Sequence, residues 1–169
     1  MNLYLARNGE NGTVKDRPMS KIQRARFRKQ HNMPSWKVMG RVSEKTGQAL
    51  KNLVLGNDTS NMSFIVNSIT NLLSVPIYDI SADSYSGEIQ TAWKRSKNYT
   101  TAEGIFFLSA DGEATIDFIS DESVVIRPHQ VVFVDDRQQY RLTSNTKTRL
   151  ILLSGKFLWD STTHANGNQ

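Results

Sequence analysis

Lys51 and Asn52 follow Gln48 by three and four residues, so a helix would present all three polar side chains on one face. Side-chain amides pair with the edge of adenine, and an ammonium group reaches a guanine edge or a phosphate. Gly47 precedes them and is expected on the same outward side. We therefore expect four residues of one helix to contact DNA bases: Gly47, Gln48, Lys51 and Asn52.

The helices that must position these residues are predicted from apolar periodicity between residues 20 and 73. A helix over 20–30 is followed by helices over 34–42 and 46–55, the last two joined by a short turn. In a helix-turn-helix, the second helix enters the major groove with its N-terminal residues at base edges. The apolar residues expected to pack these helices together are Val38, Met39, Val42, Leu50, Leu53, Ile65, Ile69 and Leu72.

Positive charge is concentrated in the first third of the chain. Residues 1–55 hold twelve Lys and Arg against three acids, whereas residues 56–169 hold nine against thirteen. A basic region of this size is an electrostatic footprint for a polyanion, although a solvated basic face without a partner has the same composition. Thr46 is the expected N-cap of the second helix, whose N-terminus attracts phosphate. The expected contacts to the DNA backbone are Arg24, Arg28, Lys29, Lys37, Lys45 and Thr46.

Four segments resemble, in order, the helices of the Cro-like phage-repressor (XRE) helix-turn-helix family: "IQRARFRKQ", "SWKVMGRV", "TGQALKNLVLG" and "MSFIVNSITNLLSVPIYDI". The resemblance is one of pattern over about sixty residues, and it departs from the family at Met39 and in the residues before Gly56. It implies a DNA-binding domain of short helices. A helical bundle whose Gln48 and Asn52 merely face solvent is the alternative.

After Pro76 the pattern changes to short alternating runs that are typical of β-strands, with turn signals every eight to twelve residues. The segments "GIFFLSADGEATIDF" and "SVVIRPHQVVFVDDRQQYRLTS" resemble the cupin-like β-barrel that serves as a sensor or dimerisation domain in many regulators, including AraC-type ones. An immunoglobulin-like sandwich has a similar rhythm. The apolar run "RLILLSGKFLW" is either a central strand or an edge covered by a second subunit.

Together these patterns predict an α+β protein of two domains, in which an N-terminal all-α helix-turn-helix bundle precedes a C-terminal antiparallel β-barrel or sandwich. The predicted segments are a flexible basic arm at 1–19, a helix-turn-helix domain at 20–76, a linker at 77–87, a β-barrel dimerisation or sensor domain at 88–160 and a disordered tail at 161–169.

Motifs for catalysis or metal binding are not evident in the sequence. The chain has no cysteine, and His31, His129 and His164 fall in three different regions, which excludes a three-histidine metal site within the β-domain. Asp135 and Asp136 end a strand, where they cap a turn or bind a cation. Phosphate-binding glycine loops and nucleophile elbows are absent. We therefore expect no enzyme activity, no metal and no cofactor.

These observations favour a DNA-binding transcriptional regulator of phage or plasmid type, a repressor that binds a double-stranded DNA operator. We expect a homodimer through the β-domain, because two half-sites add their binding energies. No apolar run is long enough to cross a membrane, so a cytoplasmic, nucleoid-associated protein is expected. The alternative is a protein–protein adaptor or inhibitor with a basic helical lobe and a β-sandwich lobe. RNA binding has less support, and no motif indicates a small-molecule effector.

Overall fold

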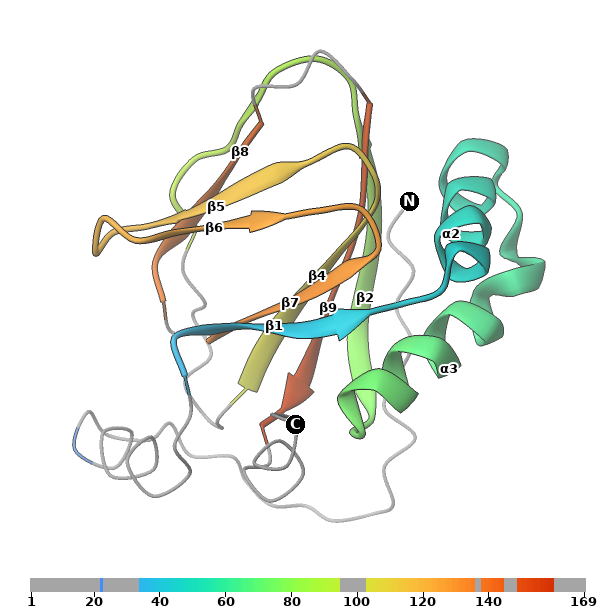
Figure 1. Cartoon of the computed structure of the whole chain (residues 1–169), viewed down its shortest axis with the longest axis horizontal. Helices are drawn as coiled ribbons and strands as arrows, with labels where there is room; N and C mark the ends of the chain where they lie inside the picture. The colour runs from blue at the N-terminus through green and yellow to red at the C-terminus, as the bar shows by residue number, and fades with distance from the viewer. Residues whose placement is uncertain (1–21, 23–33, 95–102, 136–137, 145–148, 160–169) are drawn as a thin grey trace.

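The described residues form two antiparallel β-sheets packed face to face, with two helices on the outer side of the larger sheet (Figure 1). The computed structural model describes residues 22, 34–94, 103–135, 138–144 and 149–159. Several features expected from the sequence lie outside these residues, namely the arm at 1–19, the tail at 161–169, and Arg24, Arg28 and Lys29.

The larger sheet has five antiparallel strands in the order β1-β7-β4-β9-β2. Its strands are β1 (Trp36–Arg41), β7 (Gln130–Asp135), β4 (Glu103–Asp111), β9 (Leu150–Leu158) and β2 (Ile77–Tyr85). β9 pairs with β4 on one side and β2 on the other. The long apolar run near the C-terminus is therefore a central strand and not an edge.

The smaller sheet has four strands in the order β3-β8-β5-β6. Its strands are β3 (Ile89–Gln90), β8 (Tyr140–Ser144), β5 (Ala114–Phe118) and β6 (Ser123–Ile126). Along β5, Ala114, Ile116 and Phe118 are buried and the residues between them are partly exposed. This alternation turns one face of the sheet towards the larger sheet and leaves the other towards solvent.

Two α-helices and a 3-10 turn connect β1 to β2: α2 (Glu44–Gly56), η1 (Thr59–Asn61) and α3 (Met62–Leu73). Ser43 is the N-cap of α2, because its Oγ accepts a hydrogen bond of 3.2 Å from the backbone N–H of Thr46. The expectation that Thr46 itself caps the helix was wrong. Past Gly56 the chain leaves the helix through Asn57, whose φ of 51° is left-handed and whose N–H bonds to the carbonyl of Asn52.

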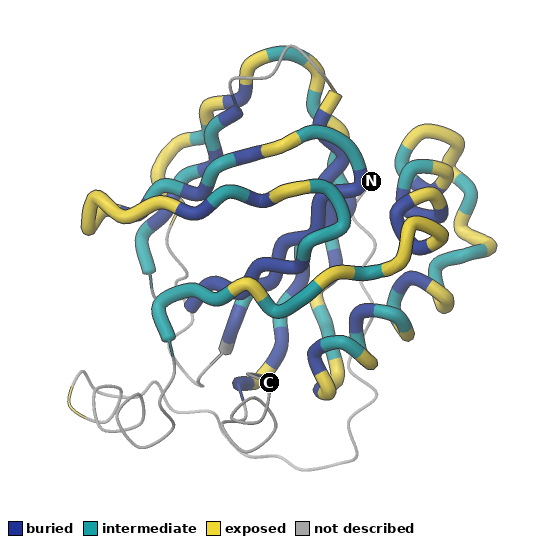
Figure 2. The backbone as a smooth tube through the Cα atoms, in the orientation of Figure 1, coloured by how far each residue is buried: buried dark blue, intermediate teal, exposed yellow. Residues whose placement is uncertain are grey.

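Two apolar layers hold the molecule together. One lies between the sheets, where Phe107, Ile116 and Leu152 are buried. The other lies between the helices and the outer face of the larger sheet, where Leu50 and Ile69 join strand residues in one cluster. Figure 2 shows the buried side of each helix turned towards the sheet. Because the helices bury their apolar faces on strands, the described residues share one continuous fold.

The predicted two-domain fold with an all-α helix-turn-helix bundle was therefore wrong. The segment expected as a helix over 34–42 is strand β1, which pairs with β7 from Trp36 opposite Val134 to Arg41 opposite Gln130. The ladder with β7 supplies the backbone hydrogen bonds that a helix would have made internally. A register shift between Val38 and Gly40 interrupts the strand alternation, which explains why the apolar spacing suggested a helix.

Residues 77–87, the predicted linker, contain β2, whose Ile80 and Ala82 are buried against the helices. Within the ranges that the structure describes, no helix is long and apolar enough to cross a membrane.

Candidate ligand-binding site

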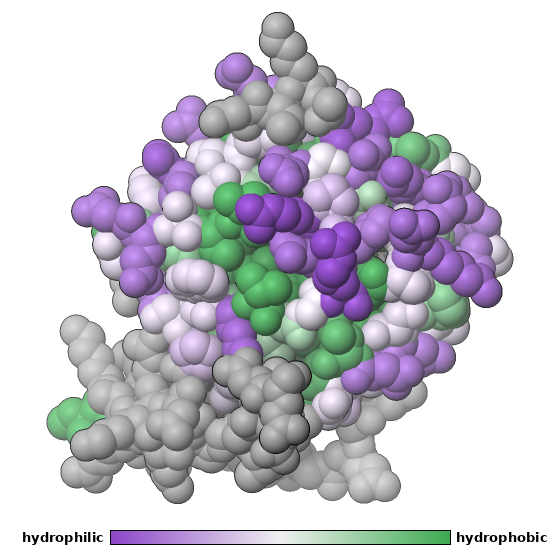
Figure 3. Space-filling model, in the orientation of Figure 1, coloured by the Kyte–Doolittle hydropathy of each residue, from purple (hydrophilic) through white to green (hydrophobic). Residues whose placement is uncertain are grey.

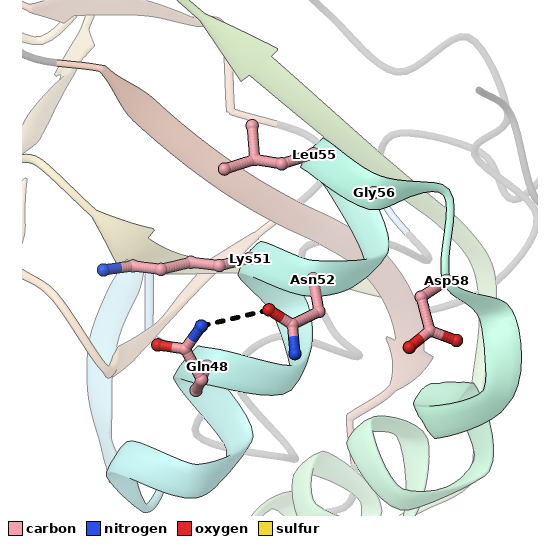
Figure 4. A pocket seen from close by; sticks show the side chains of 6 residues that line it. All are labelled: Gln48, Lys51, Asn52, Leu55, Gly56 and Asp58. Carbon is pink, nitrogen blue, oxygen red and sulfur yellow. Dashed lines mark hydrogen bonds between the residues drawn. The ribbon is translucent and has the colours of Figure 1, made fainter.

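The residues expected to contact DNA bases lie on α2, and part of this set reaches solvent. Gln48 and Asn52 are exposed and are joined by a hydrogen bond of 3.0 Å from Gln48 Nε2 to Asn52 Oδ1 (Figure 4). Lys51 lies beside them, and its Nζ is 3.7 Å from Asp111 Oδ2 at the end of β4. The amides therefore satisfy each other in part, and the ammonium group is directed to the sheet.

Gly47 and Thr46 are buried, so neither has the exposure that contact with DNA requires. A Cβ atom on Gly47 would lie 2.5 Å from His129 Nε2, which shows that the imidazole packs directly on this turn of α2. Thr46 Oγ1 donates a hydrogen bond of 3.1 Å to Ser68 Oγ on α3. Both residues therefore hold α2 against neighbouring elements and are not available for contact with a binding partner.

Three of the expected backbone contacts lie within the described residues, namely Lys37, Lys45 and Thr46. Lys37 lies on the edge strand β1 and Lys45 lies in the first turn of α2. The Lys45 ammonium lies over the Phe64 ring, 5.2 Å from its centre, where the two make a cation–π interaction.

A shallow depression of about 450 Å³ follows the outer side of α2 and is lined by Gln48, Lys51, Asn52, Leu55, Gly56 and Asp58 (Figure 4). The surface over this helix is mainly hydrophilic (Figure 3). The Asp58 carboxylate accepts hydrogen bonds from the side chain and the backbone N–H of Ser60. These bonds lower the pKa of Asp58, the side-chain bond having the larger effect. Asp58 caps η1 and Gln48 bonds to Asn52, so several polar groups of this surface already make hydrogen bonds within the protein.

A second, more enclosed pocket of about 170 Å³ opens between the two sheets. We call it the inter-sheet pocket. Strands β2, β4 and β9 of the larger sheet form one wall, and β8 with the segment before residue 95 forms the other. Its polar lining consists of Asp79, Asp83, Tyr85, Lys94, Tyr140, Ser154 and Lys156, and its apolar lining consists of Ile105, Phe107, Leu142 and Leu152 with Gly155.

A β-bulge places an acid opposite a base at one end of the inter-sheet pocket. The pairing of β2 with β9 shifts between Tyr78 and Ser81, and Asp79 within this shift has a left-handed φ of 49°. Asp79 Oδ2 lies 3.6 Å from Lys156 Nζ. Gly155 lies opposite the bulge, where a Cβ atom would be 2.5 Å from the Phe106 ring. The position on β9 that faces the bulge therefore has no room for a side chain, and Gly155 occupies it.

Asp83 and Tyr85 provide a second polar group farther along β2. The Asp83 carboxylate accepts a hydrogen bond of 3.2 Å from Ser81 Oγ. Burial raises the pKa of the Tyr85 phenol, and the negative charge of Asp83 adds to this effect. Tyr85 therefore stays protonated at neutral pH and offers an O–H donor beside a carboxylate.

Aromatic side chains from the two sheets meet between these polar ends. The rings of Phe107 on β4 and Tyr140 on β8 have centroids 5.7 Å apart and meet edge to face. Lys94 pairs with Tyr140 through a β-bridge, which holds the lysine at the pocket wall. The pocket thus combines an apolar floor with charged groups of both signs.

This pocket was not predicted from the sequence. The signal was present in β9, where the inward positions change from Leu150 and Leu152 to Ser154 and Lys156. In the described ranges, no three His, Cys, Asp or Glu side chains lie close enough together to share a metal ion. His129 packs on α2.

No protein-family model matches the chain, and no curated protein matches it. Solved structures with partial similarity include a cupin superfamily protein from Desulfitobacterium hafniense, which is 22% identical with a TM-score of 0.37 over 48% of this chain and 66% of that chain. A protein described as a predicted oxalate decarboxylase from Thermotoga maritima is 14% identical with a TM-score of 0.41, over 49% of this chain and 68% of that chain.

The cupin domain of CENP-C from Drosophila melanogaster is 12% identical with a TM-score of 0.37, over 44% of this chain and 57% of that chain. Each of these three similarities covers less than half of the present chain. Two of the three are described as cupin proteins.

Proposed function

We propose that this protein binds a small polar molecule in the inter-sheet pocket. One observation carries the proposal: two carboxylates, two ammonium groups and two phenols converge on one pocket with an apolar floor. Polar groups placed against an apolar surface fix the orientation of a small ligand in its site.

The change of residue type along β9 supports a binding role over a purely structural one. Leu150 and Leu152 continue the apolar layer between the sheets, whereas Ser154 and Lys156 interrupt it. Bringing a charged group between two sheets costs desolvation energy, which an apolar residue of similar volume avoids. The Asp79 carboxylate offsets only part of this cost, because that side chain is half exposed.

A blocking substitution tests this function. Ser154→Trp fills the pocket, whereas Ser84→Trp adds the same side chain at an exposed position on the opposite face of β2. Ligand-observed NMR with a library of small polar compounds should reveal compounds that bind the wild-type protein and the Ser84→Trp variant but not the Ser154→Trp variant. The proposal fails if no compound binds, or if every bound compound also binds the blocked pocket.

A second proposal rests on residues 1–33, which hold eight Lys and Arg against only Glu10 and Asp16. We propose that this segment binds double-stranded DNA, which retains the expected role in regulation without a helix-turn-helix. Neutralising phosphates releases counterions, so binding of this kind weakens steeply with salt. Dimerisation through the β-sandwich likewise remains a proposal, and sedimentation of the purified chain tests it.

Charge neutralisation tests the DNA proposal. Replacing Arg24, Arg26, Arg28 and Lys29 together by Gln should weaken binding to duplex DNA and make its salt dependence shallower. The matched control replaces four basic residues of the folded part that are not among the expected DNA contacts: Arg41, Arg127, Arg141 and Arg149. Equal loss in both variants contradicts a role for the segment. A protein that ignores DNA at low salt and captures one protein partner favours the adaptor alternative.

A further inference from the structure

Resting on the proposed pocket, we infer that its ligand is a small zwitterion whose ammonium and carboxylate groups stand at opposite ends of a short apolar chain. This is the chemistry of an ω-amino acid. The inference follows from the balance, spacing and remaining hydrogen-bonding capacity of the charged groups.

The charges in the pocket lining balance. Asp79 and Asp83 contribute two carboxylates, and Lys94 and Lys156 contribute two ammonium groups. A ligand with a net charge would leave one lining group without a counter-charge in a partly desolvated space, which is unfavourable. A ligand that carries one charge of each sign preserves the balance.

The charged groups are also separated along the strands. Asp83 lies opposite Leu152 on β9, and Lys156 lies four residues farther along the same strand. At a rise of about 3.3 Å per residue, these positions are roughly 13 Å apart before the side chains shorten the gap. A molecule with both charges on one carbon atom therefore meets only one end of the pocket.

Each end retains hydrogen-bonding capacity for a ligand. The Lys156 ammonium has three N–H donors, of which the ion pair with Asp79 occupies one side, so it also accommodates a ligand carboxylate. The Asp83 carboxylate accepts from Ser81 and has further lone pairs for a ligand ammonium, next to the Tyr85 hydroxyl.

The middle of the pocket suits methylene groups. Phe107 on β4 lies opposite Ser154 on β9, and the Phe107 ring packs against Tyr140 from the other sheet. Leu152 and Leu142 complete this apolar stretch. The volume of about 170 Å³ is below the roughly 300–1,000 Å³ of pockets for drug-sized molecules, which indicates a short chain.

Four probes with the same five-carbon skeleton test the inference by titration calorimetry on the full chain: 5-aminopentanoate, L-norvaline, pentanoate and pentylamine. We expect 5-aminopentanoate to bind at least tenfold more tightly than the other three, a difference of about 1.4 kcal/mol. L-norvaline carries both charges at one end, and the remaining two probes carry one charge each. Equal affinity for any of these three overturns the inference, as does the absence of binding by 5-aminopentanoate.

Two pairs of variants locate the binding. Asp83→Asn and Lys156→Met should each weaken binding of 5-aminopentanoate at least tenfold. Asp111→Asn and Lys51→Met make the same changes in an ion pair on the outer surface and should leave the affinity unchanged. Equal effects of both pairs contradict the assignment. If other compounds bind in a manner that Ser154→Trp blocks while 5-aminopentanoate does not bind, the ligand class is wrong and the binding function stands.

Discussion

Asp79 Oδ2 lies 3.6 Å from Lys156 Nζ across a β-bulge in β2, and Asp79 reaches this position with a left-handed backbone. For an L-residue other than glycine, this conformation costs roughly 1–2 kcal/mol, although Asp tolerates it better than most. The surrounding ladder with β9 holds the residue in place. Backbone strain of this kind is common at ligand sites, and here it directs a carboxylate to the polar end of the inter-sheet pocket.

Replacing Asp79 separates the backbone effect from the ion pair. Asp79→Gly and Asp79→Ala both remove the carboxylate, but only glycine adopts the left-handed conformation without strain. We expect the glycine variant to be more stable than the alanine variant by about 1 kcal/mol in urea unfolding.

Ser84 on the same strand provides the control for this pair, since its φ is not left-handed. There the order should reverse, because glycine weakens a strand relative to alanine. Equal stability of the two Asp79 variants would show that the bulge relaxes and that its geometry is not fixed by the ladder.

Gly155 should tolerate no side chain. In Gly155→Ala the new Cβ atom would lie 2.5 Å from the Phe106 ring, so we expect a loss of about 1–3 kcal/mol by overpacking. Gly56→Ala is the matched control, because nothing lies within 4 Å of its Cβ position and alanine favours the helix. Thermal unfolding of both variants checks this contrast, and a Gly155→Ala protein as stable as the wild type contradicts the packing described around the bulge.

The strands after residue 88 were predictable because their alternation reports burial directly. In β5, for example, Ala114, Ile116 and Phe118 point to the sheet interface and the residues between them do not. β2 was missed because its alternation is between apolar residues on one face and polar residues on the other, inward face. Its inward positions include Asp79, Ser81 and Asp83, and polar residues facing a pocket give the composition of a linker.

The helix that carries Gln48 was predicted, as was the exposure of Gln48 and Asn52, because helical spacing separates them from Leu50 and Leu53. What this apolar face packs against was not predictable from spacing. An apolar helix face fits a sheet as well as another helix, and here the partner is the larger sheet. The inter-sheet pocket joins residues far apart in sequence, such as Asp83 and Lys156, which only the pairing of β2 with β9 brings together.

Tyr85 should ionise at higher pH than an exposed tyrosine. Burial is the main cause of its raised pKa and the charge of Asp83 is the second, so Asp83→Asn should reduce the shift without abolishing it. Because the folded state holds this proton more tightly than the unfolded state, the associated stability is complete below about pH 10 and is lost as pH rises above it.

Ultraviolet difference titration of the wild-type protein against Tyr85→Phe isolates this group, and urea unfolding at alkaline pH gives the associated change in stability. A Tyr85 that titrates like a solvent-exposed phenol would show that the pocket wall does not bury it.

The helices and the larger sheet should unfold together, since one apolar layer joins them. Leu50 is fully buried in this layer, and Leu50→Ala should lower the free energy of unfolding by about 2–5 kcal/mol. Leu55 on the same helix is 52% exposed, and Leu55→Ala should change it by less than about 0.5 kcal/mol. Far-ultraviolet circular dichroism and tryptophan fluorescence should follow a single transition in both variants, because Trp159 belongs to the same layer as Leu50. Separate transitions for the helical signal and the fluorescence would mean that the helices form an independent unit, as the apolar periodicity first suggested.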